Sequence, residues 1–470
     1  INRLVASVSE HRLDQWLPQT ALPELLGEKS LRQGDDHYYR ISDKLLSCQN
    51  SIEEHIRNQQ RSLFSLDRSI LLYDLTNTHF EGLCKRNPKA RHGKNKQKRN
   101  DCRQVVVGMV FDGSGFELAH KVFEGNQSDS KSLIDMIKAM DECTGASTSR
   151  GDTKPIVILD GGIASRENLK LLRKKGFSYL VNDSRRKRVR YEKEFGEESE
   201  FGLITGRDSS PSVLVRMIEE EAYGEDEEKG RESTERVVLC RSDARGEKER
   251  AIVSNAEKRF LSDLEKLKKR VANGKLINKT KVERSVGRIQ SKHTRIQRYY
   301  DIDLVGNERV EKVIWKRKDE DFRRNSKLFG CYVLRTDIDT LTDVELWRLY
   351  ITLTRAEEGF QCLKRDLGLR PNRHQREDRV DAHIFITVLA YQLMCYICRK
   401  LEMNGDSRDW DTIRRVLRTH CFTTIILPTK NGTVYRIRKA AQPEGCQRQI
   451  YEALGIDWKN LPTTKTKYKR

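Results

Sequence analysis

Residues 341–366, LTDVELWRLYITLTRAEEGFQCLKRD, form the stretch that most constrains how this chain can fold. Thr342 can cap the N-terminus of a helix here, because Glu345 follows three residues later and can complete a capping box. The stretch has no proline, and its first glycine is Gly359. The pattern therefore predicts one helix over the whole stretch.

One face of this predicted helix mixes apolar and polar side chains. Tyr350, Glu357 and Lys364 are spaced seven residues apart, which is close to two helical turns, so they share a face with Leu353 and Phe360. A solvated face with an intrahelical salt bridge is the ordinary explanation for such charges. A stripe of Leu and Phe, however, normally faces a core, where unpaired polar groups are costly. The alternative is that this face lines a site that needs an acid and a base together.

The charge balance indicates a polyanionic partner. The chain has 470 residues, which is enough for roughly two to four domains. Lys and Arg together number 90 against 70 Asp and Glu, a net charge of +20. An ordinary basic surface is the alternative, but the excess is large for this length, so we expect a long polyanion to bind.

Cysteine usage and hydropathy are typical of a cytosolic protein. Eleven cysteines are scattered without a paired framework, as expected for reduced thiols. Cys395 and Cys398 form a CxxC inside an apolar helical run, and we interpret them as core residues. The longest apolar run, 384–398, is interrupted by Gln392 and is predicted to be too short to span a bilayer. No signal peptide is visible.

The order of predicted elements indicates the fold class. Residues 1–69 are predicted to be helical, either as a small DNA-binding or dimerisation module or as a packing layer. Three strands, a helix, a strand, a helix and a strand then follow at 69–74, 104–112, 116–123, 129–143, 155–160, 165–175 and 177–182. This order predicts an α/β, ribonuclease-H-like core, with a mixed sheet flanked by helices.

The chain changes character after Arg190. Acidic runs, strand-like pieces and a very basic helical stretch at 255–300 predict a mixed β and helical insertion into the core. A second apolar helix is predicted at 378–401, and the last seven residues are basic and expected to be frayed. The predicted parts are an N-terminal region, the first part of the core, the insertion, the second part of the core and a C-terminal region, at 1–69, 70–190, 191–340, 341–402 and 403–470.

Three acids stand out on these elements. Asp74 and Asp160 each end a predicted apolar strand, and Glu357 lies on the helix described above. Acids at the carboxyl ends of strands project from the sheet edge where active sites of open α/β sheets lie. Each aspartate alone is more often a cap or turn former, but converging carboxylates suit Mg²⁺, which prefers oxygen ligands. Two such ions would serve phosphodiester displacement.

Four segments resemble the DDE transposases of bacterial insertion sequences, in the insertion-sequence-four-like branch with its Tyr-Arg-Glu-Lys signature. LLYDLTNTHFEG, residues 71–82, looks like the first-acid strand of that family, and VFEGNQSDSKSL, 122–133, is similar to its Gly-Asn-x-x-Asp segment. VILDGGIASRENLKLL, 157–172, looks like the second-acid segment. YITLTRAEEGFQCLKRDLGLRPNRHQREDRVDAHIFI, 350–386, resembles the signature region.

This resemblance implies a catalytic triad of Asp74, Asp160 and Glu357 that binds two Mg²⁺ or Mn²⁺ ions. It also implies that Tyr350 and Lys364 contact phosphates of the transposon end, roles that a hydroxyl donor and a point charge can fill. We expect Asp74 to bridge both ions and the other two acids to hold one each.

Two positions depart from the family pattern. The signature arginine falls at Leu353, although Arg355 is near enough to bind DNA instead. The second acid is followed by Gly161, where many relatives carry a basic residue. Neither departure removes a metal ligand, but both concern how strongly the DNA end is bound.

Further DNA contacts are predicted from two basic runs. Arg185, Arg186, Lys187 and Arg188 form a basic run just after the strand predicted at 177–182, close to the edge that carries the acids. The loop at 84–103 is rich in Lys and Arg, and its candidates are Lys94, Lys96 and Lys98. Both runs are otherwise explained as solvated loops. His383 is interpreted as a packing histidine rather than a ligand.

These observations predict a DNA transposase that cuts at insertion-sequence ends and joins the cut strand to target DNA. Its partners would be double-stranded terminal repeats and target DNA, bound by a homodimer in the bacterial cytosol or nucleoid, with no membrane involved. Two alternatives stay open: an inactive or repurposed transposase that only binds DNA, and a ribonuclease-H-like nuclease that does not join strands.

Overall fold

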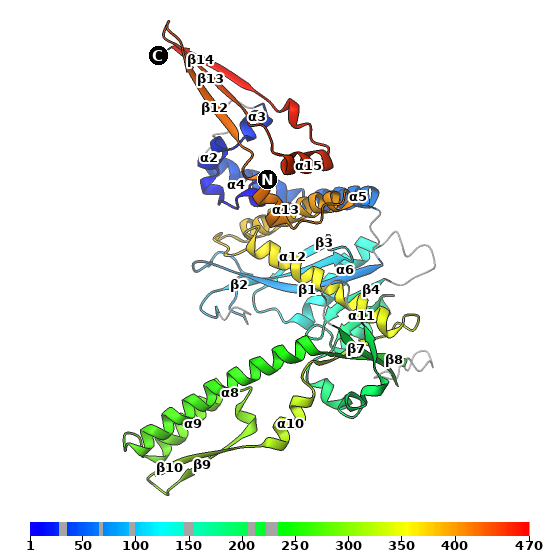
Figure 1. Ribbon diagram of the computed structural model, residues 1–470, viewed down its shortest axis with the longest axis vertical. Helices are drawn as coiled ribbons and strands as arrows, with labels where there is room; N and C mark the ends of the chain where they lie inside the picture. The colour runs from blue at the N-terminus through cyan, green and yellow to red at the C-terminus, as the bar shows by residue number, and fades with distance from the viewer. Residues whose placement is uncertain are drawn as a thin grey trace. The chain divides into compact units, whose positions relative to one another are not determined.

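The computed structural model describes residues 1–27, 35–64, 69–93, 99–144, 155–204, 212–221 and 234–469 (Figure 1). The chain divides into two compact units. The first comprises Ile1–Leu159, Ser165–Phe177 and Thr352–Arg470, and the second comprises Asp160–Ala164 and Ser178–Ile351. The domain limits expected from the sequence stay predictions, and each unit is described here by itself.

The first unit contains a mixed sheet in the order β3-β2-β1-β4. Its strands are β1 (Ile70–His79), β2 (Gln104–Asp112), β3 (Glu117–Glu124) and β4 (Ile156–Asp160). The first three form an antiparallel meander, and β4 pairs with β1 in parallel. Asp112 shapes the β2–β3 hairpin, because its Oδ1 accepts the backbone N–H groups of Ser114 and Phe116. The predicted ribonuclease-H-like α/β core is confirmed.

Strand β1 is longer than the sequence predicted. We expected it to end at Asp74, but it continues to His79, so Asp74 lies in mid-strand. The continuation stays paired with β2, where Thr76 lies opposite Val107 and Thr78 opposite Val105. These threonines are β-branched and buried, so they suit a pleated strand although they are polar.

Helices cover both faces of this sheet. On one face, the Tyr73 hydroxyl donates to Ser132 Oγ at 2.8 Å in α6 (Asp129–Thr144), and α7 (Arg166–Lys174) packs beside α6. On the other face, α12 (Leu353–Arg365) lies against β1, with Phe360 edge-on to Phe111 of β2 at a ring-centroid distance of 5.3 Å (Figure 1). The sheet is therefore buried between helical layers.

The central helix of the first unit is α13 (Glu377–Met403). From the sequence, the apolar run at 384–398 was predicted to be too short to cross a membrane. The helix that contains it is long and apolar enough to do so, judged by length and composition alone. Its most apolar window is 61% buried, as in the core helix of a soluble protein. Inside the unit, Gln392 Nε2 donates to Glu117 Oε2 at 2.7 Å, so its polar side chain has a partner.

The ends of the chain pack around α13. The described N-terminal residues form α1 (Asn2–Val5), α2 (Leu13–Trp16), α3 (Leu22–Leu25), α4 (Asp35–Ser47) and α5 (Gln49–Phe64), of which α1 and α4 contact α13. The C-terminal elements are α14 (Trp410–Leu417), β12 (Phe422–Pro428), β13 (Thr433–Ala440), α15 (Gly445–Leu454) and β14 (Thr464–Lys469). The prediction that the C-terminal tail is frayed is therefore wrong, because β14 pairs with β13 in an antiparallel arrangement.

The second unit contains five neighbouring strands of the large sheet, in the order β5-β11-β8-β7-β6. The strands are β5 (Ser178–Asn182), β6 (Gly202–Ile204), β7 (Val213–Glu221), β8 (Thr234–Ser242) and β11 (Cys331–Thr336). Between β8 and β11 the chain forms α8 (Asp243–Ala272), α9 (Lys279–Lys292), β9 (Tyr300–Val305), β10 (Lys312–Arg317) and α10 (Asp319–Lys327). Gly274, with φ +71°, lies in the turn after α8, so the stretch at 255–300 that the sequence predicted to be helical is divided there.

The stretch predicted to be one helix is two. The capping box at Thr342 and Glu345 is confirmed by reciprocal hydrogen bonds of 2.9 and 3.3 Å, but α11 (Asp343–Ile351) ends before Thr352 and α12 begins after it. The break falls where Ile351 and Thr352 are both β-branched, and such residues are weak helix formers. The division between the two units also falls there. Of the three polar residues spaced seven apart, Glu357 and Lys364 therefore lie on one helix, α12, whereas Tyr350 lies on α11.

Candidate active site

Asp74 lies on the face of the core sheet that α12 covers. Side chains alternate along a strand, so Leu72, Asp74 and Thr78 of β1 share one face. Leu72 is opposite Phe111, the ring that meets Phe360 of α12. At the other end, Thr78 Oγ1 donates to the carbonyl oxygen of Leu369, just beyond α12, at 2.8 Å. The half-buried carboxyl group of Asp74 is thus placed between two contacts with the α12 segment.

Glu357 lies at the border of the buried stripe of α12. The stripe comprises Leu353, Ala356, Phe360 and Leu363, whereas Glu357 is exposed. The sequence interpretation that placed Glu357 on a buried stripe is therefore wrong, because the stripe follows three- and four-residue steps and Glu357 falls beside it. The carboxylate keeps its hydration while the helix that carries it is fixed.

Close packing fixes α12 beside Gly359. A Cβ added at this glycine would lie 2.6 Å from the Tyr391 hydroxyl and 3.2 Å from the ring of Phe111. The absence of a side chain therefore lets α12 approach both α13 and β2. The Tyr391 hydroxyl in turn donates to the carbonyl oxygen of Gly115 at 2.7 Å, which joins α13 to the β2–β3 hairpin.

The parallel pairing of β1 with β4 ends directly before an aspartate in each strand. The last pair in the β1–β4 register is Tyr73 with Leu159, and the two aspartates are the next residues of their strands. Each carboxylate accepts the backbone N–H of the residue that follows it, Leu75 at 2.7 Å and Gly161 at 2.8 Å. Asp160 is exposed, as a ligand for a hydrated ion must be.

In the second unit, Gly161 and Tyr350 meet at Asn182, a residue that sequence reasoning missed. A Cβ at Gly161 would lie 2.4 Å from the carbonyl oxygen of Asn182, so a basic residue does not fit here. Asn182 Nδ2 donates to the Tyr350 hydroxyl at 2.8 Å. Asn182 ends the apolar strand β5, but no pattern in the sequence pairs it with a tyrosine so far along the chain.

Two predicted phosphate contacts lie on α12 itself. The half-buried Lys364 places its ammonium group 5.3 Å from the centre of the Phe360 ring, in a cation–π contact. Arg355 is exposed, and its Nη1 donates to the carbonyl oxygen of Gly113 in the β2–β3 hairpin at 2.8 Å. Arg355 therefore already uses one N–H group within the fold.

The comparisons with known proteins identify the family. A family model described as the transposase DDE domain matches residues 65–393, a range that includes all three acids. The chain belongs to the transposase DDE domain family. No curated protein matches it.

Two solved structures of transposases resemble this chain distantly. The cryo-EM structure of a piggyBac transposase synaptic complex with hairpin DNA shares 10% identity at a TM-score of 0.38, over 87% of this chain and 66% of that one. The Mos1 transposase paired-end complex with a left transposon end shares 10% identity at a TM-score of 0.17, over 37% and 58%. The chain thus spans somewhat less than two thirds of either relative.

Two residues of the basic run after β5 form ion pairs within the fold. Arg185, Arg186 and Lys187 are exposed. Lys187 Nζ lies 2.8 Å from Asp183 Oδ1, and Arg185 Nη2 lies 3.6 Å from Glu249 Oε1. The cations of both pairs are exposed, whereas the carboxyl groups of Asp183 and Glu249 are buried. The predicted contacts of Lys94, Lys96 and Lys98 lie outside the described residues.

Arg188, the next residue of that run, has a structural role. It is buried, and its Nη1 donates to Glu249 Oε2 at 3.0 Å and to the carbonyl oxygen of Cys331 at 3.2 Å. This fourth cation is therefore not part of a DNA-binding loop, although the sequence places it beside three that are exposed.

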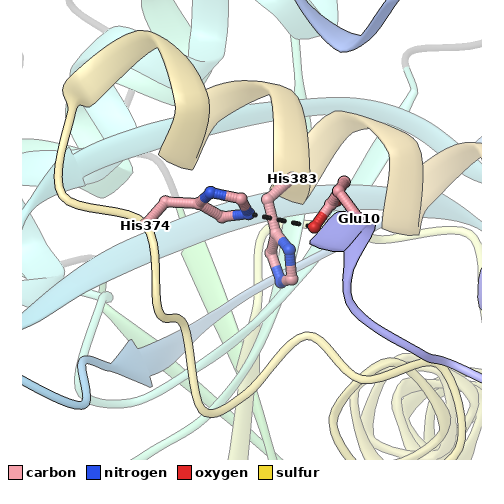
Figure 2. Close-up of side chains that lie close together, drawn as sticks. All are labelled: Glu10, His374 and His383. Atoms are coloured by element: carbon pink, nitrogen blue, oxygen red, sulfur yellow. Dashed lines mark ion pairs between the residues drawn. The ribbon is translucent and has the colours of Figure 1, made fainter. Parts of the chain in front are cut away.

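Among the described residues, one His/Cys/Asp/Glu group has a geometry that could hold a metal ion: Glu10, His374 and His383 (Figure 2). Arg3 already occupies it. Its Nη2 lies 3.2 Å from Glu10 Oε1 and 2.8 Å from His383 Nδ1, and a divalent cation there would repel it. Burial lowers the pKa of both histidines, so both are neutral at pH 7. The cluster fastens the N-terminal residues to α13, which agrees with the interpretation of His383 as a packing residue.

Proposed function

We propose that this protein is a DNA transposase in which Asp74, Asp160 and Glu357 hold two Mg²⁺ ions. The observation that carries the proposal is the β1–β4 register, which makes Asp74 and Asp160 the next residues after one parallel pair. The helix that carries Glu357 packs on the face to which Asp74 points. The donor set is all carboxylate and partly exposed, which fits Mg²⁺ rather than a metal that prefers nitrogen or sulfur.

Transposase DDE domains use divalent metal ions, which when bound would activate the attacking oxygen and neutralise charge on the phosphate. The residues of this chain would hold and orient the DNA strand. Lys364 lies two turns beyond Glu357 on α12, so we assign it to a phosphate near the cut. The Tyr350 hydroxyl oxygen accepts from Asn182 Nδ2 at 2.8 Å, and we assign Tyr350 to a phosphate of the DNA end by its resemblance to the tyrosine of the family signature.

The finer features of the proposal follow from the resemblance. We infer cutting at the ends of a bacterial insertion sequence and joining of the new 3′ hydroxyl to target DNA. The DNA would be bound by a homodimer in the cytosol or nucleoid. The family match and the net charge of +20 support a DNA partner.

The test is a cleavage and strand-transfer assay on the DNA that flanks this reading frame, with Mg²⁺ or Mn²⁺. Asp74→Asn, Asp160→Asn and Glu357→Gln should each abolish cleavage while DNA binding persists. Glu358→Gln is the matched control, because Glu358 is an exposed acid one position along α12. It should leave cleavage close to wild type.

Each other outcome changes the proposal in a defined way. Activity that depends on Glu358 and not on Glu357 would move the third ligand by one residue. Cleavage without joining would make the protein a nuclease. Binding without cleavage by the unmodified protein would make it a repurposed transposase, and the proposed function would be wrong.

A further inference from the structure

The C-terminal sheet of the first unit has two different faces. Its strands are antiparallel in the order β12-β13-β14, and they form the long orange and red ribbon of Figure 1. Cross-strand partners share a face, so the register assigns every residue to one side. One side carries Val434, Arg436, Arg438, Thr464 and Thr466.

That side contacts the N-terminal helices through Arg438. Arg438 Nε lies 3.0 Å from Glu24 Oε1 in α3, and Arg438 Nη2 donates to the carbonyl oxygen of Thr20 at 2.6 Å. Val434 on the same side is 5% exposed. The opposite side of the sheet therefore faces away from α3.

The opposite side, which we call the lysine face, carries a row of cations beside apolar residues. The row is Lys465, Lys467 and Lys469 of β14, all exposed. Lys467 lies opposite Tyr435 of β13, which lies opposite Leu427 of β12. Tyr435 is 44% exposed and Leu427 is 48% exposed, so the lysine face is open to solvent across the sheet.

The lysine face has no acidic partners among the described residues. The three strands contain three basic residues in β13, three in β14 and no Asp or Glu. None of the three β14 lysines forms an ion pair in the described parts of the chain. A row of like charges on one strand is self-repulsive, and it gains free energy when a polyanion neutralises it.

The spacing of this row matches a nucleic-acid backbone. Alternate residues of a strand are about 6.8 Å apart. Successive phosphates of one DNA strand rise about 3.4 Å along the helix axis and also wind around it, so the distance between neighbouring phosphates is larger than that rise and comparable with the lysine spacing. Exposed lysines at this spacing, with an aromatic side chain beside them, can follow phosphates without reading bases.

We propose that the lysine face of β12–β14 binds the phosphate backbone of duplex DNA, separately from the carboxylate site. The inference rests on the proposed function for the identity of the polyanion. Because it concerns backbone contacts, it predicts binding that is independent of DNA sequence and sensitive to salt.

The experiment uses the full chain and two variants with the same change in net charge. Lys465→Gln with Lys467→Gln removes two cations from the lysine face. Thr464→Glu with Thr466→Glu adds two acids to the opposite face of the same strand. Binding of a labelled duplex is measured over a salt series by fluorescence anisotropy, and thermal melting confirms that each variant is folded.

The lysine variant should flatten the slope of log K against log salt by about 1.8, because each phosphate contact contributes about 0.9. At about 0.15 M salt this is roughly a thirtyfold loss of affinity, equal for an element end and an unrelated duplex. The threonine variant should keep the wild-type slope. An unchanged slope in the lysine variant, or equal losses in both variants, would overturn the proposal.

Two further measurements separate this inference from its rivals. Binding to anionic lipid vesicles that the lysine variant loses, with an unchanged DNA slope, would assign the lysine face to a membrane and overturn the proposal. At DNA concentrations above its Kd, the lysine variant should cleave like wild type. If the unmodified protein binds DNA through the lysine face but never cleaves it, the proposed function fails and this inference stands.

Discussion

The two sheets of the first unit differ in what covers them. The core sheet is enclosed, because Tyr73 hydrogen-bonds Ser132 of α6 on one face and Phe111 packs against Phe360 of α12 on the other. The C-terminal sheet is tied to the N-terminal helices through Arg438 on one face, and its lysine face is exposed. Both are built largely from antiparallel pairs, so pairing alone does not set their roles.

The difference shows that the packing of other elements on the faces of a sheet decides which role the sheet can have. Packing on both faces fixes the backbone, so a single carboxylate such as Asp74 can be held where one bond is to be cut. An exposed sheet cannot place one group so firmly, but it can present equal charges at a regular spacing. The first arrangement suits chemistry, and the second suits affinity for a repeating polymer.

The largest expected difference is in stability. Phe360→Ala empties a packed site at a side chain that is 3% exposed, and it should lower the free energy of unfolding by about 3–5 kcal/mol. Leu427→Ala on the lysine face should cost about 0.5 kcal/mol or less. Urea unfolding followed by circular dichroism measures both. Similar losses would show that the two sheets are equally packed.

Lys364→Ala should distinguish the role of a lysine on α12, which covers the core sheet, from that of the lysines on the lysine face. Losing one charged hydrogen bond to phosphate costs about 1.5–3 kcal/mol, so binding of the element end and cleavage should fall about ten- to a hundredfold. Binding of unrelated DNA should change little, unlike in the β14 variants. Gel shifts and cleavage rates on both DNAs test this. If Lys364→Ala behaved as wild type, its role would be limited to packing over Phe360.

Acid should destabilise the fold of the first unit through His383. This side chain is 5% exposed and faces Arg3, Glu10 and His374. Burial lowers the pKa of His383 well below its usual value, so below about pH 6.5 the unfolded chain binds a proton that the folded chain does not. Stability is therefore complete above that pH and falls as pH drops. Between pH 7.5 and about 5.5 the free energy of unfolding should therefore fall, by at most about 1.4 kcal/mol for this one group.

The control for this effect is the difference between wild type and His383→Gln in urea unfolding at the two pH values. The variant lacks the titrating group, so its stability should fall less on acidification. A Lys467→Gln variant should keep the wild-type pH dependence, because its side chain is exposed. An equal fall in wild type and His383→Gln would contradict the assignment.

The smallest effect is expected at Tyr350. Tyr350→Phe removes one neutral donor and the acceptor for Asn182, which is worth about 1 kcal/mol, so end binding should weaken about fivefold. Asn182→Ala should have a similar effect if Asn182 acts by orienting that hydroxyl. In the Tyr350→Phe background, Asn182→Ala should then add little. Full additivity in this double-mutant cycle would show that the two residues act independently.

The sequence predicted the order of elements because its signals are local. Apolar, β-branched runs such as the one at 104–112 pair as strands wherever they fall. It could not predict that β1 continues past Asp74, because Thr76 and Thr78 are buried by partners distant in the chain. Nor could it predict that Gly161 is required by the carbonyl oxygen of Asn182, which is a contact made in three dimensions.

The candidate acids were found from the sequence, but their surroundings were not. Asp74 and Glu357 were identified by position and resemblance, and the structure adds that α12 packs on the strand that carries Asp74. The burial of Arg188 among exposed neighbours depends on Glu249 in α8. A run of like charges in a sequence does not show which member faces inward.

Helix α13 has a consequence for how the chain is made. Its apolar surface is covered by α1 at the start of the chain and by α15 near its end. A ribosome therefore releases α13 before the segment that completes its cover has been synthesised. Contacts between such distant segments form late, and until then the most apolar helix of the protein is open to other chains. Chaperone demand during translation is thus set by the position of α15.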